Sequence, residues 1–260
     1  MITAKNNPRL KRIAALLKSA SKRREEKAFV IEGIKMYTEA FLQCPERLQE
    51  VYVTSEAEKE LGAKGLLGKY EILSDECFSH VANTVTPQGV LAVVSMPGYT
   101  IDELVSEKPV KLLLLDDVRD PGNLGTIIRT AEAAGHSVIL SGESVDITNP
   151  KVVRSTMGAI FRVPYLYAGS LTETIGVLKE KVCGIKVYAS ALDESAESYK
   201  KTDFSGSTAT VIGNESRGVS AEVIAAADAK VYIPMKGKTE SLNAAVAAAI
   251  LMYEAGKFSA

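Results

Sequence analysis

Residues 239–243 read Thr239-Glu240-Ser241-Leu242-Asn243 and open an alanine-rich stretch that ends at Gly256. Alanine has the highest helix propensity, and serine is a preferred N-cap residue, so a helix is predicted over 241–255 with Ser241 as its N-cap. The alanines at 244, 245, 247, 248 and 249 make this helix slim. The alanines are explained by helix propensity alone, and they are equally typical of a helix that passes close to other backbone.

Two further polar clusters lie upstream. The first is Asn123-Leu124-Gly125-Thr126-Ile127-Ile128-Arg129, and the second is Gly213-Asn214-Glu215-Ser216-Arg217-Gly218. Apolar runs over 110–115 and 208–212 precede them, so each cluster is expected at a strand-to-helix junction, where α/β proteins bind ligands. The first is predicted to start a helix over 123–134 with Asn123 as N-cap. Taken singly, each cluster is also the pattern of an ordinary cap or turn.

Predicted strands and helices alternate along most of the chain. The continuous apolar run over 110–115 is typical of a central parallel strand that is covered on both faces. Met96-Pro97-Gly98, several charges and Pro109 interrupt the alternation. We therefore expect a domain over 1–95, a linker over 96–109 and a second domain over 110–260. The fold class is α/β, with a mostly parallel sheet in the second domain.

Composition restricts the class of protein. The 260 residues are 46% hydrophobic and 24% charged, an ordinary globular balance. No apolar run approaches the ~20 residues that span a bilayer, and no signal peptide is recognisable, so neither membrane insertion nor secretion is expected. Cys44, Cys77 and Cys183 are scattered without a CxxC spacing. This pattern favours a reduced cytoplasm and neither a disulfide framework nor a metal site.

Charge is distributed unevenly. Residues 1–35 hold ten Lys and Arg against three acidic residues, a segment charge of +7, while the whole chain carries −1. A basic segment on an acidic body is typical of nucleic-acid-binding proteins. A solvated helix face explains the same pattern equally well.

Together, in this order and with these spacings, the three clusters resemble the signature motifs of the SpoU (TrmH-like) RNA 2′-O-methyltransferases, over roughly residues 110–256. The resemblance implies an α/β-knot fold, in which the C-terminal segment threads a loop to form a deep trefoil knot. It also implies S-adenosylmethionine as cofactor and a homodimer as the active form.

The resemblance carries over to individual positions. It implies catalytic roles for Asn123, Arg129, Glu215, Ser241 and Asn243. It implies cofactor contacts from Gly213, Asn214, Ile233, Met235 and Leu242, and Ser190–Leu192 lies where a further contact is plausible. The family account gives proton removal from the ribose 2′-hydroxyl to Arg129. Because a guanidinium stays protonated in proteins, we expect Arg129 to hold the 2′-oxygen and favour the alkoxide, with the RNA-facing arginine supplied by the other subunit. His80 and His136 match no motif and are interpreted as structural.

A second resemblance covers residues 1–95. Asn6–Lys11, Arg23-Arg24, Phe29–Gly33 and Thr86–Val90 are similar to the substrate-binding domain that precedes many SpoU domains, an α/β/α unit of the ribosomal protein L30e type. This similarity implies rRNA rather than tRNA as the substrate. The candidate phosphate contacts are Lys5, Arg9, Lys11, Arg12, Arg23 and Arg24. Glu32-Gly33 is as compatible with a structural turn.

The sequence therefore predicts an S-adenosylmethionine-dependent methyltransferase that acts on a ribose 2′-hydroxyl of RNA, with 23S rRNA as the expected substrate. Two alternatives stay open: a non-catalytic RNA-binding or ribosome-assembly protein of the same fold, and a tRNA 2′-O-methyltransferase. A nicotinamide-dependent dehydrogenase is disfavoured because neither GxGxxG nor a Walker loop is present.

Overall fold

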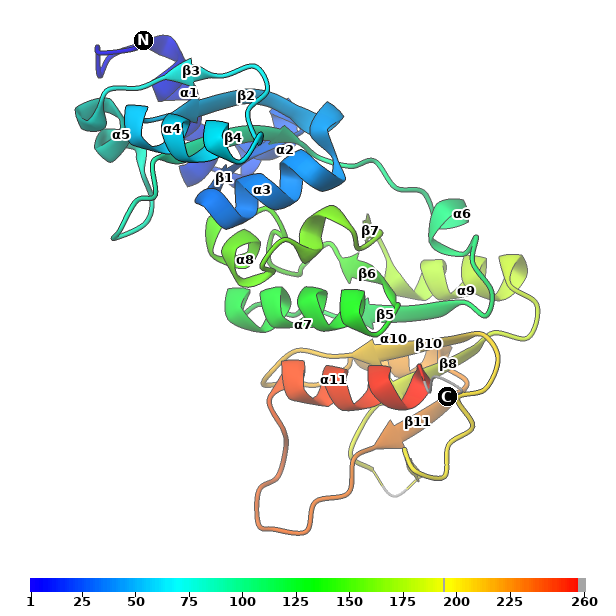
Figure 1. Cartoon of the computed structure of the whole chain (residues 1–260). Coiled ribbons are helices and arrows are strands. Elements are labelled where there is room, and N and C mark those ends of the chain that lie inside the picture. The colour runs from blue at the N-terminus through cyan, green and yellow to red at the C-terminus, as the bar shows by residue number, and fades with distance from the viewer. Residues whose placement is uncertain (194, 257–260) are drawn as a thin grey trace. The chain divides into compact units, whose positions relative to one another are not determined.

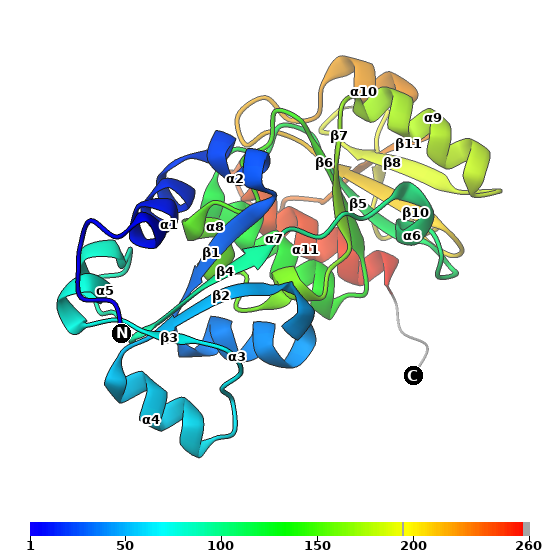
Figure 2. The same cartoon turned by 90° about the horizontal axis from the view of Figure 1, so that it is seen from above.

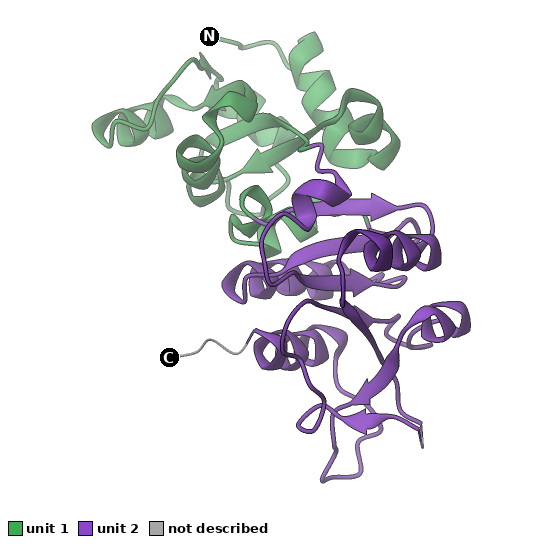
Figure 3. Cartoon of the chain, turned by 90° about the vertical axis from the view of Figure 1, so that its right-hand side faces the viewer, with its two compact units in different colours: residues 1–97, 146–162 green, residues 98–145, 163–260 purple. Residues whose placement is uncertain are grey.

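The computed structural model describes residues 1–193 and 195–256, which divide into two compact units. Unit 1 contains residues 1–97 and 146–162, and unit 2 contains residues 98–145 and the described residues from 163 onward (Figure 3). Within the described residues, no helix is both long enough and apolar enough to cross a membrane.

Unit 1 is built on a four-stranded sheet, counted over the described residues. The strands are β1 (Ala28–Glu32), β2 (Leu48–Val53), β3 (Glu71–Ile72) and β4 (Val90–Ser95), in the spatial order β1-β4-β2-β3. β4 pairs antiparallel with both β1 and β2, and β3 joins β2 in parallel. All five residues of β1 are buried, which accounts for the short apolar run in the sequence.

Helices cover both faces of this sheet. α1 (Pro8–Lys18) and α5 (Asp75–Val81) contribute Leu10, Ile13 and Phe78 to one apolar core. α3 (Ile34–Gln43) lies on the opposite side of the strands from α1, and α4 (Ser55–Ala63) packs on β2 (Figure 2). The remaining elements of unit 1 are α2 (Ala20–Glu26), α8 (Pro150–Ser155) and the 3-10 helices η1 (Pro45–Arg47) and η2 (Ala159–Phe161).

The segment 146–162 belongs to unit 1, although its place in the sequence lies between two strands of unit 2. α8 packs against β1, and η2 packs against α3. Arg162 forms an ion pair with Glu39 on α3. The sequence places this segment in the predicted second domain, because no local sequence pattern reveals side-chain partners that are distant in the chain. Conversely, Leu104 and Val105 of the expected linker are buried in the core of unit 2.

Unit 2 contains a seven-stranded sheet, again counted over the described residues, and all its pairings are parallel. Its order is β7-β6-β5-β10-β8-β11-β9. The strands are β5 (Lys111–Leu115), β6 (Ser137–Ser141), β7 (Tyr165–Ala168), β8 (Lys186–Ser190), β9 (Glu197–Ser198), β10 (Thr208–Ile212) and β11 (Ala229–Tyr232). The predicted mostly parallel α/β sheet is confirmed.

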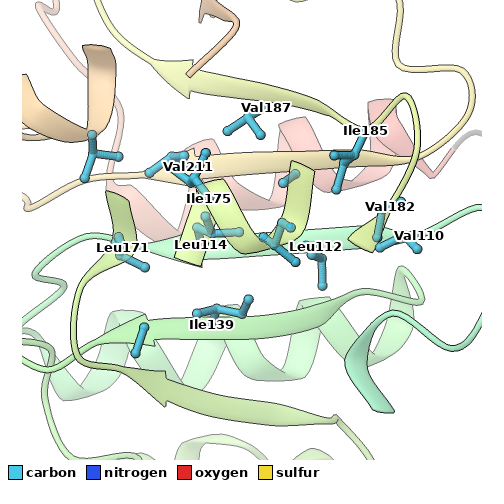
Figure 4. Close-up of a cluster of buried hydrophobic side chains, with 14 of the residues drawn as sticks. Val110, Leu112, Leu114, Ile139, Leu171, Ile175, Val182, Ile185, Val187 and Val211 are labelled. Carbon is cyan, nitrogen blue, oxygen red and sulfur yellow. The ribbon is translucent and has the colours of Figure 1, made fainter. Parts of the chain in front are cut away.

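Helices of unit 2 pack on this sheet. α9 (Leu171–Lys181) and α10 (Ala221–Ala226) share an apolar core with Leu112 and Leu114 (Figure 4), and α6 (Ile101–Leu104) adds to it. Side chains alternate along a strand, so Leu113 and Leu115 point to the other face. α7 (Pro121–Ala133) and α11 (Ala244–Ala255) pack against each other and against β5, β6 and β10 (Figure 1).

Two predicted helix starts are wrong, because a nearby residue other than the expected one forms the N-cap. The helix expected from Asn123 begins at Pro121, because the Asp120 carboxylate is the N-cap and accepts from the Asn123 N–H at 2.8 Å. The helix expected from Ser241 begins at Ala244, because Asn243 is the N-cap.

Candidate functional site

The three polar clusters meet in unit 2. β5 leads into the loop before α7, β10 leads into the loop at 213–218, and β11 leads into the segment before α11. Because these strands are parallel members of one sheet, their carboxyl ends lie at the same edge.

Side-chain hydrogen bonds connect one residue from each cluster. Asn123 Nδ2 donates to Glu215 Oε1 at 3.0 Å, and Asn243 Nδ2 donates to Asn123 Oδ1 at 2.8 Å. The backbone N–H groups of Asp120 and Arg119 also donate to the Glu215 carboxylate. Three of the five predicted catalytic residues therefore form one continuous chain.

Glu215 is held as a carboxylate. Burial raises its pKa, but hydrogen bonds from Asn123 and from the backbone of Asp120 and Arg119 outweigh that effect, and the pKa lies below its usual value. An ionised carboxylate accepts hydrogen bonds only, so it fixes the orientation of the Asn123 amide. That orientation in turn presents Asn123 Oδ1 to Asn243.

Asn214 shapes the second loop. Its Oδ1 accepts from the N–H groups of Ser216 and Arg217, and its backbone pairs with Gly218 in both directions. Its Nδ2 donates to the carbonyl of Asp117 at 2.9 Å, which joins this loop to the loop after β5. At Gly213 an added Cβ would lie 2.0 Å from the carbonyl carbon of Gly218. Only glycine permits the loop to fold back so closely.

A cavity of about 330 Å³ lies beside the chain of hydrogen bonds. Four of the five predicted cofactor residues line it, namely Gly213, Asn214, Ile233 and Leu242. Met235 is not among its lining residues. Ser190–Leu192 also line the cavity, as do Glu215 and Ser241. Its size lies within the usual ~300–1,000 Å³ range of small-molecule sites, and its lining combines apolar side chains with a few polar groups.

Ser241 and Arg129 lie outside the hydrogen-bonded chain. Ser241 is exposed at the cavity, and Arg129 is exposed on α7. Neither side chain has a hydrogen bond or ion pair with any described residue. Arg129 follows Asn123 by six residues, which is about 9 Å along a helix axis. Its guanidinium is thus available to a group from outside the protomer.

The candidate phosphate contacts of unit 1 separate into two groups. Lys5, Arg9 and Arg12 form ion pairs with Glu76, Glu71 and the pair Glu26 and Glu50, respectively. Arg23 is buried, with 3% of its surface exposed, and its guanidinium is bound to Asp146, so its side chain is not available for a phosphate contact. Lys11 and Arg24 are exposed, and their side chains have no partner among the described residues.

Neither histidine is among the residues that line the cavity. His80 is exposed at the end of α5. His136 is buried, its Nδ1 lies 2.9 Å from the carbonyl of Ala134, and its Nε2 has no partner within the described part of the chain. Burial lowers the pKa of His136 to about 4. No group of three His, Cys, Asp or Glu suited to a metal ion occurs among residues 1–193 and 195–256.

Two residues that join the loops were missed from sequence. Asp117 adopts a left-handed backbone with φ 60°, and its carboxylate forms ion pairs with Arg119 and Arg217. Asp120 caps α7 and, through its N–H, helps to hold Glu215. The signal for Asp120 was present, because an acidic residue directly before Pro121 is a typical N-cap followed by proline at N1. Asp117 had no such signal.

Comparisons with known proteins agree with this geometry. Residues 111–253 match the SpoU rRNA Methylase family, and residues 7–92 match the MRM3-like substrate binding domain. The 23S rRNA (guanosine(2553)-2′-O)-methyltransferase RlmP of Bacillus subtilis is 39% identical over 238 residues, which cover 91% of this chain and 92% of that protein.

Solved structures extend the similarity to the fold. An AdoMet-bound rRNA methyltransferase from Sinorhizobium meliloti superposes with a TM-score of 0.84 at 30% identity, covering 98% of this chain and 96% of that one. The SpoU methyltransferase AviRb from Streptomyces viridochromogenes, in complex with AdoMet, gives 0.83 at 28% identity, covering 97% and 98%. A TrmH/SpoU tRNA modifying enzyme from A. aeolicus (TM-score 0.50, 27% identity) covers only 56% of this chain and 74% of its own. The chain belongs to the SpoU rRNA methylase family.

Proposed function

We propose that this protein transfers a methyl group from S-adenosylmethionine to a ribose 2′-hydroxyl of 23S rRNA. The observation that carries the proposal is the chain Glu215–Asn123–Asn243 beside the cavity at the carboxyl edge of the parallel sheet. Family membership and the rRNA-directed relatives support the same reaction.

The residues of the cavity suit the cofactor. Ile233 and Leu242 offer apolar surface, and the backbone of the tightly folded loop after Gly213 offers polar groups at close range. Bound S-adenosylmethionine would supply an electrophilic methyl group on a sulfonium. We assign Gly213, Asn214, Ile233 and Leu242 to this site. Met235 is kept as a weaker candidate, since it does not line the cavity.

The remaining residues would prepare the nucleophile. A ribose hydroxyl is weakly acidic, so a positive charge near the 2′-oxygen favours its deprotonated form. We assign this role to Arg129, whose side chain is exposed and has no partner in the described residues. Asn123, Ser241 and Asn243 would orient the ribose, and Glu215 would hold Asn123. The proton leaves to water or to a neighbouring phosphate.

We further propose a homodimer in which Arg129 acts on RNA bound at the partner's cavity. Val246 and Tyr253, seven residues apart on the same face of α11, are 48% and 51% exposed, which supports an interface there. We also propose a trefoil knot in the C-terminal segment and a cytoplasmic location. The proposed substrate-binding domain over 1–95 precedes a catalytic domain over 110–260, whose segment 146–162 belongs structurally to unit 1.

Ribosomal RNA is favoured over transfer RNA. The rRNA methyltransferase structures cover almost the whole chain, whereas the tRNA modifying enzyme covers little more than half of it. The substrate-binding domain match over 7–92 accounts for most of that difference.

The test is transfer of labelled methyl to rRNA from a strain that lacks this protein, with tRNA in parallel. We expect label in 23S rRNA alone, and a loss of about a hundredfold or more with Arg129→Ala, at unchanged RNA affinity. Label in tRNA would establish the tRNA enzyme. RNA binding without cofactor binding or transfer would establish the non-catalytic alternative.

A further inference from the structure

The short helix α2 has two flanks of different chemistry. On one flank Lys22 forms ion pairs with Glu25 and Glu26, and Glu26 also pairs with Arg12. The other flank carries Arg24, and Lys27 follows at the C-cap. Both of these side chains are exposed and have no partner among the described residues. Both residues lie at the C-terminal end of α2, where the chain leaves the helix at Lys27 with a left-handed backbone.

α8 presents a second pair of unpartnered cations. Val152 and Val153 are buried, whereas Lys151 is exposed and Arg154 is half-buried. Lys151 and Arg154 are three residues apart and share one face. Neither side chain has a hydrogen bond or ion pair within the part of the chain that the structure describes.

Buried Arg23 brings the two pairs together. Its Nη2 donates to Asp146 Oδ2 at 2.6 Å, its Nε donates to Thr148 Oγ1 at 3.2 Å, and its Nη1 donates to the carbonyl of Leu16 at 2.7 Å. Arg23 precedes Arg24 directly, and Thr148 lies three residues before Lys151, a span of at most about 11 Å. α2 and α8 also both pack on β1 (Figure 2).

The charge of this surface is not compensated. The carboxylate of Asp146 is already paired with Arg23, and Glu25 and Glu26 are paired with Lys22 on the other flank of α2. Arg24, Lys27, Lys151 and Arg154, here called the α2–α8 basic face, thus hold four free positive charges. Several unpaired cations on elements that pack against the same strand are typical of surfaces that bind polyanions.

We propose that the α2–α8 basic face binds the phosphate backbone of the substrate RNA. The inference rests on the proposed function and adds to it Lys151 and Arg154, which lie in the sequence of the methyltransferase domain. The buried Arg23–Asp146 pair is the positioning element that joins them to Arg24 and Lys27. Phosphate contacts orient the RNA and contribute affinity without reading sequence.

The test compares two double variants of the full-length protein on an unmodified 23S rRNA transcript. Arg24→Gln/Lys151→Gln removes one cation from each helix. The matched control is Lys59→Gln/Lys69→Gln, which makes the same change in net charge at two exposed lysines of unit 1 that are not part of the basic face. RNA affinity is measured from 50 to 300 mM salt, and AdoMet affinity and the thermal midpoint report on folding.

We expect Arg24→Gln/Lys151→Gln to weaken RNA binding about tenfold at low salt and to reduce the slope of log K against log salt by about 2. AdoMet affinity should stay at the wild-type value, and the control should change RNA affinity less than about twofold. Equal losses in both variants, or none in Arg24→Gln/Lys151→Gln, would overturn the basic face. If the wild-type protein bound no AdoMet, the proposed function would be contradicted. The comparison of RNA affinities between the two double variants would still test the basic face.

Discussion

Asn243 Nδ2 donates to Asn123 Oδ1 at 2.8 Å, although 120 residues separate them in the chain. The same Asn243 side chain caps α11, because its Oδ1 accepts from the N–H groups of Ala245 and Val246. One amide therefore both starts a helix and completes the polar chain that begins at Glu215.

These two roles can be separated by substitution. Asn243→Asp keeps an oxygen that caps α11 but loses the Nδ2 donor to Asn123, so we expect near wild-type stability with methyl transfer reduced at least tenfold. Asn243→Ala loses both, and should also lower the free energy of unfolding by about 1 kcal/mol. Urea unfolding and initial rates on rRNA measure the two effects. Full activity in Asn243→Asp would contradict a role for the Asn123 contact.

Gly213→Ala tests the close approach within the cavity wall. A Cβ at this position would lie 2.1 Å from the Val219 nitrogen and 2.3 Å from the Gly218 oxygen, so the loop must move. We expect AdoMet affinity to fall by more than tenfold in calorimetric titration. Gly169→Ala is the control, because an added Cβ there has no atom within 4 Å. Unchanged affinity in Gly213→Ala would show that the loop does not shape the cofactor site.

We expect the Arg23–Asp146 ion pair to contribute strongly to the free energy of unfolding, although neither residue lines the cavity. The exposed fractions of these side chains are 4% and 18%, and Asp146→Asn would leave a buried guanidinium without its countercharge. We expect a loss of about 3 kcal/mol in the free energy of unfolding. Glu25→Gln removes an exposed ion pair on the same helix and should cost less than about 1 kcal/mol. Equal effects of the two variants in urea unfolding would contradict the buried pair.

We expect the buried His136 to make the free energy of unfolding depend on pH. Its pKa is lowered to about 4 by burial, against about 6.5 in the unfolded chain, so between these values the unfolded state binds a proton that the folded state does not. Stability is therefore fully present above pH 6.5 and falls on acidification toward pH 4, by up to about 3 kcal/mol. His136→Asn should remove this part of the slope in urea unfolding between pH 7.5 and 4.5. A wild-type slope in the variant would assign the effect to other groups.

The sequence predicted the parallel α/β sheet and the meeting of three clusters at one edge because both follow from local patterns. The strand predicted over 110–115 is β5 (Lys111–Leu115), whose last four residues are buried, and polar residues follow directly where the strands end. Asn123, Glu215 and Asn243 could be named before their contact was seen. The two helix starts predicted at Asn123 and Ser241 are wrong by two or three residues, because Asp120 and Asn243 are the N-caps.

The features that could not be predicted from the sequence depend on contacts between residues that are distant in the chain. Arg23 and Arg24 are adjacent and chemically equal, yet one is buried against Asp146 and the other is exposed. Only the fold distinguishes a structural arginine from a free one. Likewise, the left-handed backbone of Asp117 and the position of 146–162 within unit 1 depend on contacts that are distant in the sequence.

The central claim is methyl transfer to a ribose 2′-oxygen, and the most direct measurement is the chemical position of the transferred label. Labelled 23S rRNA is hydrolysed in alkali, which cannot cleave after a 2′-O-methylated ribose because the 2′-oxygen can no longer attack the phosphate. The account predicts that the label appears in one alkali-stable dinucleotide and is absent with Arg129→Ala. Label recovered in mononucleotides would place the methyl on a base and contradict the account.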